Sequence, residues 1–143
     1  MDKIKSLGVM LDCSRDAVYS VETLKTYFDL LAKMGYDSVQ LYTEDTYEAE
    51  GEPYFGYLRG RYSKAELKEI DAAAKERGLE LIPCIQTLAH LGGLTRWREY
   101  WASCTDTGDI LLAGEERTYR LIEHMFKTCA ECFSSRRINI GMD

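Results

Sequence analysis

Short apolar runs alternate along the chain with longer segments in which apolar residues recur every three to four positions. Short runs of this kind are typical of buried strands, and the longer period is that of an amphipathic helix. The resulting order, β-α-β-α-β-α-β, indicates an α/β fold in which helices cover a parallel sheet. The predicted strands are 7–11, 38–42, 79–86 and 137–141, and the predicted helices are 20–35, 63–78 and 115–133.

Capping residues mark the ends of the first two predicted helices. Ser20 is placed to cap the first helix, which is expected to end at Gly35. Ser63 and Glu66 have the spacing of a capping box, and Gly78 is expected to end the second helix. The inward faces are expected at Leu24, Tyr27 or Phe28, Leu31 and Met34 in the first helix, at Leu67, Ile70 and Ala74 in the second, and at Tyr119, Ile122, Phe126 and Cys129 in the third.

The loops that follow the predicted strands are long and rich in polar and aromatic residues, whereas the turns that precede the strands are short. The longest loop, residues 92–114, has Trp97, Tyr100 and Trp101 at short helical spacing and is otherwise expected to be irregular. In (β/α)8 barrels the loops after the strands form the face where chemistry occurs. We therefore interpret residues 1–143 as a single domain, the first half of a (β/α)8 TIM barrel, incomplete at its C-terminus. A doubly wound sheet has the same alternation, but the first loop lacks the glycine-rich fingerprint of its common nucleotide-binding forms.

The composition narrows the classes of function. The 143 residues are 45% hydrophobic and 29% charged, as in an ordinary folded domain. The net charge of −6 and the scattered lysines and arginines provide no basic surface for nucleic acid. No apolar run approaches the roughly 20 residues that span a bilayer, and the N-terminus lacks the features of a signal peptide. A cytoplasmic protein without nucleic-acid or membrane partners is expected.

The five cysteines are odd in number and unevenly spaced, which does not suggest a disulfide framework. A reducing compartment fits this usage better. Cys129 and Cys132 form a C-x-x-C motif, but no second Cys or His pair is placed to complete a zinc site. Both lie in a predicted helix, so they are expected to be small buried hydrophobic residues.

Polar residues follow each predicted strand at its carboxyl end, where barrel chemistry takes place. Carboxylates with an arginine and a histidine suit a site for a neutral polyol, because charged groups bind vicinal hydroxyls through paired hydrogen bonds. Each residue taken alone is at least as well explained as a helix cap or a solvated loop residue. The candidates are Asp12, Ser14 and Arg15 after the first strand, Glu44 and Asp45 after the second, Gln86, Thr87 and His90 after the third, and Asn139 and Asp143 on the fourth.

Aromatic residues in the same loops leave two interpretations open. They could stack on the faces of sugar rings, or they could form the core of their own loops. The residues concerned are Tyr47, Tyr54, Trp97 and Trp101.

Four segments, taken in order, resemble glycoside hydrolase family 20. The segment 139–143, Asn-Ile-Gly-Met-Asp, is similar to the family's catalytic strand, His/Asn-x-Gly-x-Asp-Glu. The segment 11–15 resembles the family's first strand, which ends in a sugar-binding arginine, and Thr43-Glu44-Asp45 resembles its Thr-Asp-Asp. The segment 83–90 resembles Pro-Glu-Ile-Asp-x-Pro-Gly-His. The resemblance covers essentially the whole chain.

The resemblance implies a β-N-acetylhexosaminidase that uses no metal or other cofactor and acts on a glycan ending in N-acetylglucosamine or N-acetylgalactosamine. It implies substrate-assisted retention, in which the 2-acetamido oxygen of the substrate attacks the anomeric carbon. Asp143 would orient the acetamido group, and Arg15 would bind hydroxyls of the terminal sugar. Asp45 and His90 would form a relay that orients the general acid. That acid is expected directly after Asp143, so the chain alone is expected to be inactive.

Three residues depart from the family pattern. Glu44 and Gln86 stand at expected substrate-binding positions where the family has aspartate, and Ala89 replaces glycine. The sugar preference and the contact made at Gln86 therefore stay open.

Two other functions remain as alternatives. The segment 34–41 also resembles barrel sugar isomerases and epimerases, which use carboxylates and histidines around a divalent metal. Sensitivity of the activity to EDTA separates that class from the hydrolases. A half barrel also leaves the edges of its first and fourth strands unpaired, which favours self-association. The third interpretation is therefore a self-associating half barrel without hydrolase activity.

Overall fold

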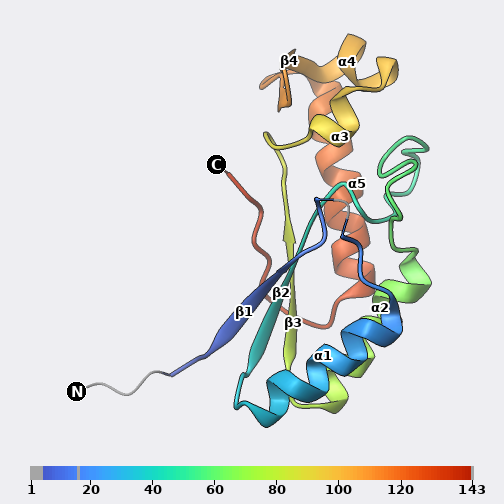
Figure 1. The fold of residues 1–143 in the computed structure, drawn as a ribbon. Helices are drawn as coiled ribbons and strands as arrows, with labels where there is room; N and C mark the ends of the chain where they lie inside the picture. The colour runs from blue at the N-terminus through green and yellow to red at the C-terminus, as the bar shows by residue number, and fades with distance from the viewer. Residues whose placement is uncertain (1–4, 16, 143) are drawn as a thin grey trace.

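The computed structural model describes residues 5–15 and 17–142. Within these residues three parallel strands form a sheet in the order β1-β2-β3, and the three longest helices lie on one side of it (Figure 1). Parallel strands joined by helices are the arrangement that the hydrophobic pattern predicts. The strands are β1 (Gly8–Asp12), β2 (Ser38–Glu44) and β3 (Glu80–Ile85), and the helices are α1 (Val21–Lys33), α2 (Lys64–Glu76) and α5 (Glu116–Cys132).

The predicted fourth strand is shorter in the structure than the sequence suggests. The segment 137–141 runs beside β3 but pairs with it at a single parallel bridge, between Cys84 and Asn139. The Asn139 amide donates to the Pro83 carbonyl and the Ile85 amide donates to the Asn139 carbonyl, each at 2.9 Å. Gly141 has a φ of +54°, which departs from strand geometry and ends the pairing. The prediction of a strand over 137–141 was therefore too long.

Both predicted helix starts are confirmed at the level of single hydrogen bonds. The Ser20 side chain accepts from the Thr23 amide at 3.2 Å, as an N-cap residue does. Ser63 and Glu66 form the reciprocal bonds of a capping box. Gly35, just after α1, has a φ of +83°, a conformation that side-chain-bearing residues rarely adopt.

The helices α1 and α2 bury most of the residues that the sequence predicts. Leu24, Phe28 and Leu31 of α1 are buried, as are Leu67, Ile70 and Ala74 of α2. Tyr27, the alternative to Phe28, is partly exposed, and Met34 is 66% exposed, so Met34 was wrongly assigned to the inward face. Met34 follows the last helical residue and forms the C-cap, just before the turn that leads into β2.

The inward face predicted for α5 was correct at Cys129 but wrong at Tyr119 and Phe126. Tyr119 and Phe126 are 56% and 38% exposed, and the buried stripe is Thr118, Leu121, Met125, Thr128 and Cys132 together with Cys129. Both stripes have helical spacing. The buried stripe looks polar in the sequence because it contains Thr118 and Thr128. Their hydroxyls donate to backbone carbonyls at 2.9 and 3.0 Å, so both can be buried.

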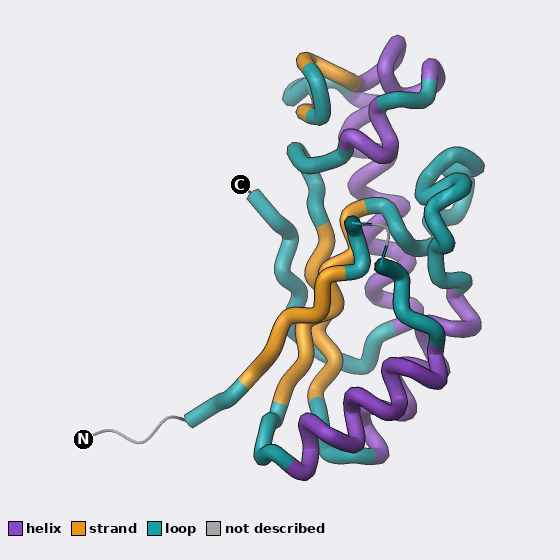
Figure 2. Tube along the Cα trace, in the orientation of Figure 1, coloured by secondary structure: helices purple, strands orange, loops and turns teal. Residues whose placement is uncertain are grey.

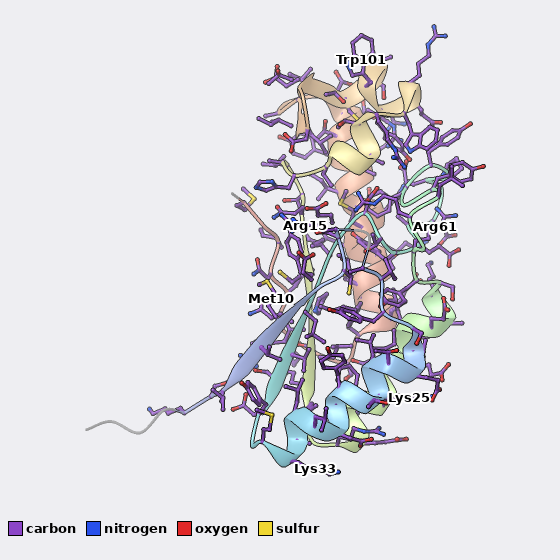
Figure 3. All side chains as sticks on the ribbon, in the orientation of Figure 1. Met10, Arg15, Lys25, Lys33, Arg61 and Trp101 are labelled. Atoms are coloured by element: carbon purple, nitrogen blue, oxygen red, sulfur yellow. The ribbon has the colours of Figure 1, made fainter. Side chains whose placement is uncertain are left out.

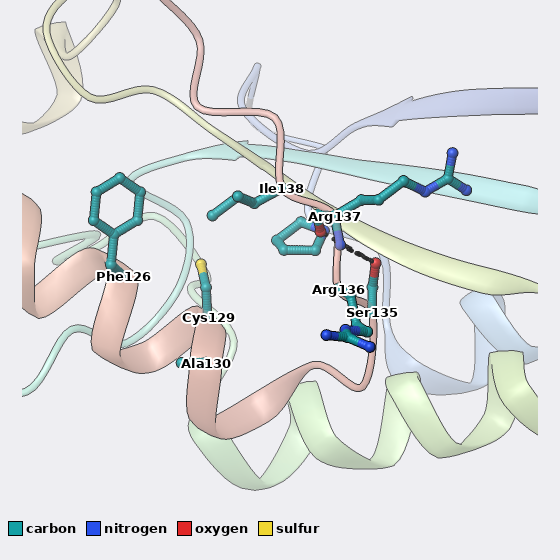
Figure 4. A pocket seen from close by; sticks show the side chains of 8 residues that line it. Phe126, Cys129, Ala130, Ser135, Arg136, Arg137 and Ile138 are labelled. Atoms are coloured by element: carbon teal, nitrogen blue, oxygen red, sulfur yellow. Dashed lines mark hydrogen bonds between the residues drawn. The ribbon is translucent and has the colours of Figure 1, made fainter.

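The outer stripe of α5 borders an apolar groove of about 250 Å³. Figure 4 shows Phe126 and Cys129 of α5 facing Ile138 of the C-terminal segment across this groove. Beside Ile138, the Arg137 amide donates a hydrogen bond to the Ser135 hydroxyl at 3.0 Å. The groove therefore leaves Phe126 partly exposed.

The region 92–114 is more ordered than predicted. It contains two short helices followed by an antiparallel hairpin, and Figure 1 shows this region beyond the carboxyl end of β3, beside one end of α5. Figure 2 shows loops after the strands extending to the same end of the sheet. The elements are α3 (Gly92–Thr95), α4 (Arg98–Cys104), β4 (Thr105–Thr107) and β5 (Ile110–Leu111).

All five cysteines are free and buried. Burial raises the pKa of Cys129 to about 12, and the thiol of Cys132 contacts the Lys64 carbonyl at 3.8 Å. The two cysteines of the C-x-x-C motif are therefore core residues, as predicted. In the described part of the chain no helix combines the length and apolarity needed to cross a bilayer.

Candidate functional site

A row of residues crosses the sheet on the face opposite the long helices. Asp12 on β1 is in register with Tyr42 on β2, and Tyr42 is in register with Cys84 on β3. Cys84 in turn bridges Asn139. Residues in register on parallel strands point to the same face, and their chain neighbours point to the other. Leu11, next to Asp12, is accordingly buried on the helix side.

This row forms the floor of a hollow that we call the strand-face pocket, with a volume of about 430 Å³. The volume lies in the range typical of small-molecule sites, roughly 300–1,000 Å³. Figure 3 shows Met10 along β1 and Arg15 beyond its carboxyl end. The residues that line the pocket are Met10, Asp12, Arg15, Tyr42, Cys84, Gln86, Asn139 and Gly141.

Arg15 lies at the mouth of the pocket and is held there by Asp12. The Arg15 Nη1 atom lies 2.7 Å from Asp12 Oδ2, and its side chain is 68% exposed. Ser14 donates to the other oxygen of Asp12 from its amide and its hydroxyl, at 2.8 and 2.6 Å. Burial opposes ionisation, but the bonds from Ser14 and Arg15 lower the pKa of Asp12. The arginine is thus exposed to solvent yet oriented by an ionised partner.

Tyr42 joins two of the predicted site residues. Its hydroxyl donates to Glu44 Oε1 at 3.1 Å and accepts from Gln86 Nε2 at 3.2 Å. The register of β2 and β3 shifts between Tyr42 and Glu44, and Glu44 has a φ of +48°. Such an irregularity at a strand end changes the direction of the next side chains. Glu44 and Gln86 are therefore connected through Tyr42, although only Gln86 lines the pocket.

Asp45 forms a buried ion pair with Arg59. Arg59 Nη1 lies 3.0 Å from Asp45 Oδ1, and the two side chains are 11% and 1% exposed. Neither Asp45 oxygen has a donor in good hydrogen-bond geometry among the described residues, so the charge of Arg59 is its main compensation. Burial raises the pKa of Asp45, and Arg59 opposes this effect. We refer to the two residues as the buried ion pair.

Arg59 connects the three loops that follow the strands. Its Nη2 atom donates to the Ser14 carbonyl in the first loop, and Asp45 lies in the second. Gly93, in the third, packs so closely that an added Cβ would overlap Arg59 Nη1 and lie 2.7 Å from Asp45 Oδ2. One guanidinium therefore contacts all three loops.

His90 lies outside the strand-face pocket. His90 is exposed, has a φ of +56°, and is not among the lining residues of the pocket in the described part of the chain. Asp143 lies outside the described residues. The structure thus brings Arg15 and Gln86 together in one pocket and connects Glu44 to them, whereas Asp45 is buried with Arg59.

Arg59 is not among the residues predicted from the sequence. It stands in an irregular loop and belongs to none of the four motifs. A weak signal was the pair of glycines around it, Gly56 and Gly60, which have φ values of +65° and +64° and allow the loop to fold inward. Tyr42 was missed as well, because a tyrosine within a strand reads as a core residue.

A second buried carboxylate, Glu52, has a structural role. Arg117 binds both of its oxygens, at 2.8 and 2.5 Å, and Tyr100 donates at 2.9 Å. His124 Nδ1 lies 2.9 Å from the same group, which agrees with the structural role predicted for this histidine. Burial alone would raise the pKa of Glu52, but the bonds from Arg117 and Tyr100 outweigh it and lower the pKa. Glu52 therefore ties the second loop to α4 and α5.

Charged and amide groups thus surround a pocket on the strand face, which suits the binding of a polyhydroxylated molecule. Among the described residues no group of three His, Cys, Asp or Glu side chains is placed to hold a metal ion.

The sequence matches no family model, and no curated protein matches it. Solved structures do match. A GH20 exo-β-N-acetylglucosaminidase from Vibrio harveyi, in complex with N-acetylglucosamine, has a TM-score of 0.86 over 97% of this chain at 20% identity. A β-N-acetylhexosaminidase from Bacteroides fragilis has a TM-score of 0.85 over 99% at 23% identity. The GH20 β-N-acetylhexosaminidase from Streptomyces coelicolor has a TM-score of 0.81 over 95% at 24% identity.

The chain has the fold of part of a GH20 β-N-acetylhexosaminidase. It spans 27% of the Vibrio harveyi chain and 32% of each of the other two. The structural likeness agrees with the resemblance seen in the four sequence motifs.

Proposed function

We propose that the protein containing this chain is a GH20-type β-N-acetylhexosaminidase, and that residues 1–143 form a single domain, the first half of its (β/α)8 barrel. The observation that carries this proposal is the placement of Arg15 and Gln86 in one pocket at the carboxyl ends of parallel strands. Barrel enzymes use that end of the strands for chemistry. The fold match to GH20 enzymes supports the same interpretation.

The proposed substrate is a glycan that ends in N-acetylglucosamine or N-acetylgalactosamine. One of the similar structures is a complex with N-acetylglucosamine, which supports this class. Arg15 is proposed to bind ring hydroxyls of the terminal sugar, since it lines the pocket and only its Nη1 atom is occupied by Asp12 and Ser14. Gln86 and Glu44, connected by Tyr42, are proposed to contact the sugar from below.

The proposed chemistry is substrate-assisted hydrolysis with retention. Asp143 is proposed to orient the acetamido group and to stabilise the positive charge that develops on it. Asp45 and His90 are proposed to orient and tune the general acid. For Asp45 this role requires that it stay ionised despite its burial, and the adjacent Arg59 favours the ionised form. No cofactor is required.

Binding of N-acetylglucosamine, measured by saturation-transfer NMR on the chain, tests the assignment of Arg15. Arg15→Met should weaken binding by about 10- to 100-fold, since hydrogen bonds to a charged group contribute about 1.5–3 kcal/mol. Arg137→Met is the matched control, because Arg137 is similarly exposed and also paired with one carboxylate, on Glu80. Equal binding by both variants would contradict the assignment.

The five free, buried cysteines fit a reducing compartment, and we propose a cytoplasmic location on that basis. Fractionation of cells that make the protein, followed by detection with an antibody, tests the location. Recovery outside the cytoplasm would refute it.

A further inference from the structure

An aromatic cluster lies outside the strand-face pocket, on the loops that follow β2 and β3. The rings of Tyr54 and Trp97 stack with centroids 5.4 Å apart and planes at 25°. Tyr57 meets both rings edge-on, at 5.9 and 5.3 Å. The guanidinium of Arg96 lies 5.1 Å from the Trp97 centroid and donates to the Tyr57 carbonyl at 3.2 Å. The rings therefore hold one another in fixed orientations.

The cluster borders a hollow of about 500 Å³ that is separate from the strand-face pocket. Tyr54 and Trp97 line the hollow together with Arg98, Glu99 and Ala102 of α4. A few polar groups beside aromatic rings are typical of sites that bind small organic ligands. Since the two charges on α4 are opposite, the hollow favours a neutral ligand over an ion.

Burial decides which of the loop aromatics can contact a ligand. Tyr47 is 2% exposed and meets Phe55 edge-on at 5.0 Å, so it belongs to the loop core. Tyr54 is 39% exposed, which leaves part of its ring accessible while Trp97 supports it. Trp101 is 67% exposed but does not line the hollow. Of the two rings that line the hollow, Tyr54 is exposed and Trp97 is half-buried, so Tyr54 is the more accessible for stacking.

We propose that this hollow is a second carbohydrate-binding site, in which Tyr54 stacks on the apolar face of a neutral pyranose. Arg98 and Glu99 bind hydroxyls at the edge of the same sugar. Because Tyr54 is already fixed by Trp97 and Tyr57, little side-chain freedom is lost on binding. The choice of a sugar as the ligand rests on the proposed function.

Tryptophan fluorescence of a Trp101→Phe chain tests this site, because Trp97 is then the only tryptophan. The probe is the neutral pentamer of β-1,4-linked N-acetylglucosamine. The fluorescence should change saturably on addition of the pentamer. In the same background Tyr54→Leu should weaken binding by about tenfold, whereas Tyr54→Phe, which keeps the ring, should bind within about twofold of the parent.

The Arg15→Met variant separates this proposal from the proposed function. A Tyr54-dependent fluorescence change that persists in Arg15→Met supports the second site, whether or not the strand-face pocket binds sugar. The second site is overturned if the pentamer causes no fluorescence change, or if Tyr54→Leu and Tyr54→Phe bind it equally. This holds even where Arg15-dependent binding of N-acetylglucosamine is intact. If ultracentrifugation shows a dimer that Tyr54→Leu dissociates, the cluster is a protein contact and the proposal is likewise overturned.

Discussion

Replacing Arg59 with methionine should show how strongly the buried ion pair holds the site together. Methionine keeps much of the apolar stem but leaves the Asp45 carboxylate, 1% exposed, without its compensating charge. Removing one partner of a buried pair costs about 3–5 kcal/mol, and with both side chains nearly inaccessible, solvent screening should reduce this little. Loss of the bond to the Ser14 carbonyl adds about 1 kcal/mol.

Urea unfolding of the wild type, Arg59→Met, Asp45→Asn and the double variant measures this cost. The double variant should recover most of the loss, because the charge of Asp45 is removed together with Arg59 and only Glu44, 4.0 Å from Arg59, loses a nearby cation. Burial raises the pKa of Asp45, and loss of Arg59 should raise it further. A neutral carboxyl carries no charge for the arginine to compensate. The loss in free energy of unfolding caused by Arg59→Met should therefore shrink as the pH falls through the pKa of Asp45. A penalty below about 1 kcal/mol that does not change with pH would refute the reasoning.

Three further predictions follow from other contacts. The pKa of Glu52 lies below its usual value of 4.5, so its contribution to stability is present above pH 4.5 and is lost as the pH falls through the folded-state pKa. In Glu52→Gln the free energy of unfolding, measured in urea, should therefore fall less steeply as the pH is lowered below 4.5. The same steep fall in the variant and the wild type would contradict the role of the carboxylate. Gly93→Ala should destabilise by about 1–3 kcal/mol in the same assay, because its Cβ meets the buried ion pair, whereas Gly92→Ala meets only Asp109 at 3.6 Å and should be nearly neutral. The Cys129 thiol, with a pKa raised to about 12, should resist Ellman's reagent at pH 8 until urea is added, and rapid labelling of this residue in the folded chain would count against its burial.

The fold was largely predictable because its signals are local. The capping box at Ser63 and Glu66 and the glycines after α1 and α2 are set by residues within one turn of the helix. The burial of α5 was not predictable in this way. Its two stripes have the same period, and only packing against α2 and α4 selects the one that contains Thr118 and Thr128.

The candidate site was predictable only where residues follow strands directly. Arg15 and Gln86 lie close to the ends of β1 and β3, so parallel pairing alone brings them into one pocket. Arg59 reaches the site from the middle of a loop, through contacts that no sequence spacing encodes. His90 is exposed and has a left-handed backbone, neither of which its position in the motif indicates.

The most direct test of the account is the release of 4-nitrophenol from 4-nitrophenyl N-acetyl-β-glucosaminide by the intact protein that contains this chain. The account predicts activity that survives EDTA and falls by about 10- to 100-fold in Arg15→Met, with Arg137→Met near the wild type. Activity abolished by EDTA, or equal activity in Arg15→Met and the wild type, would contradict it.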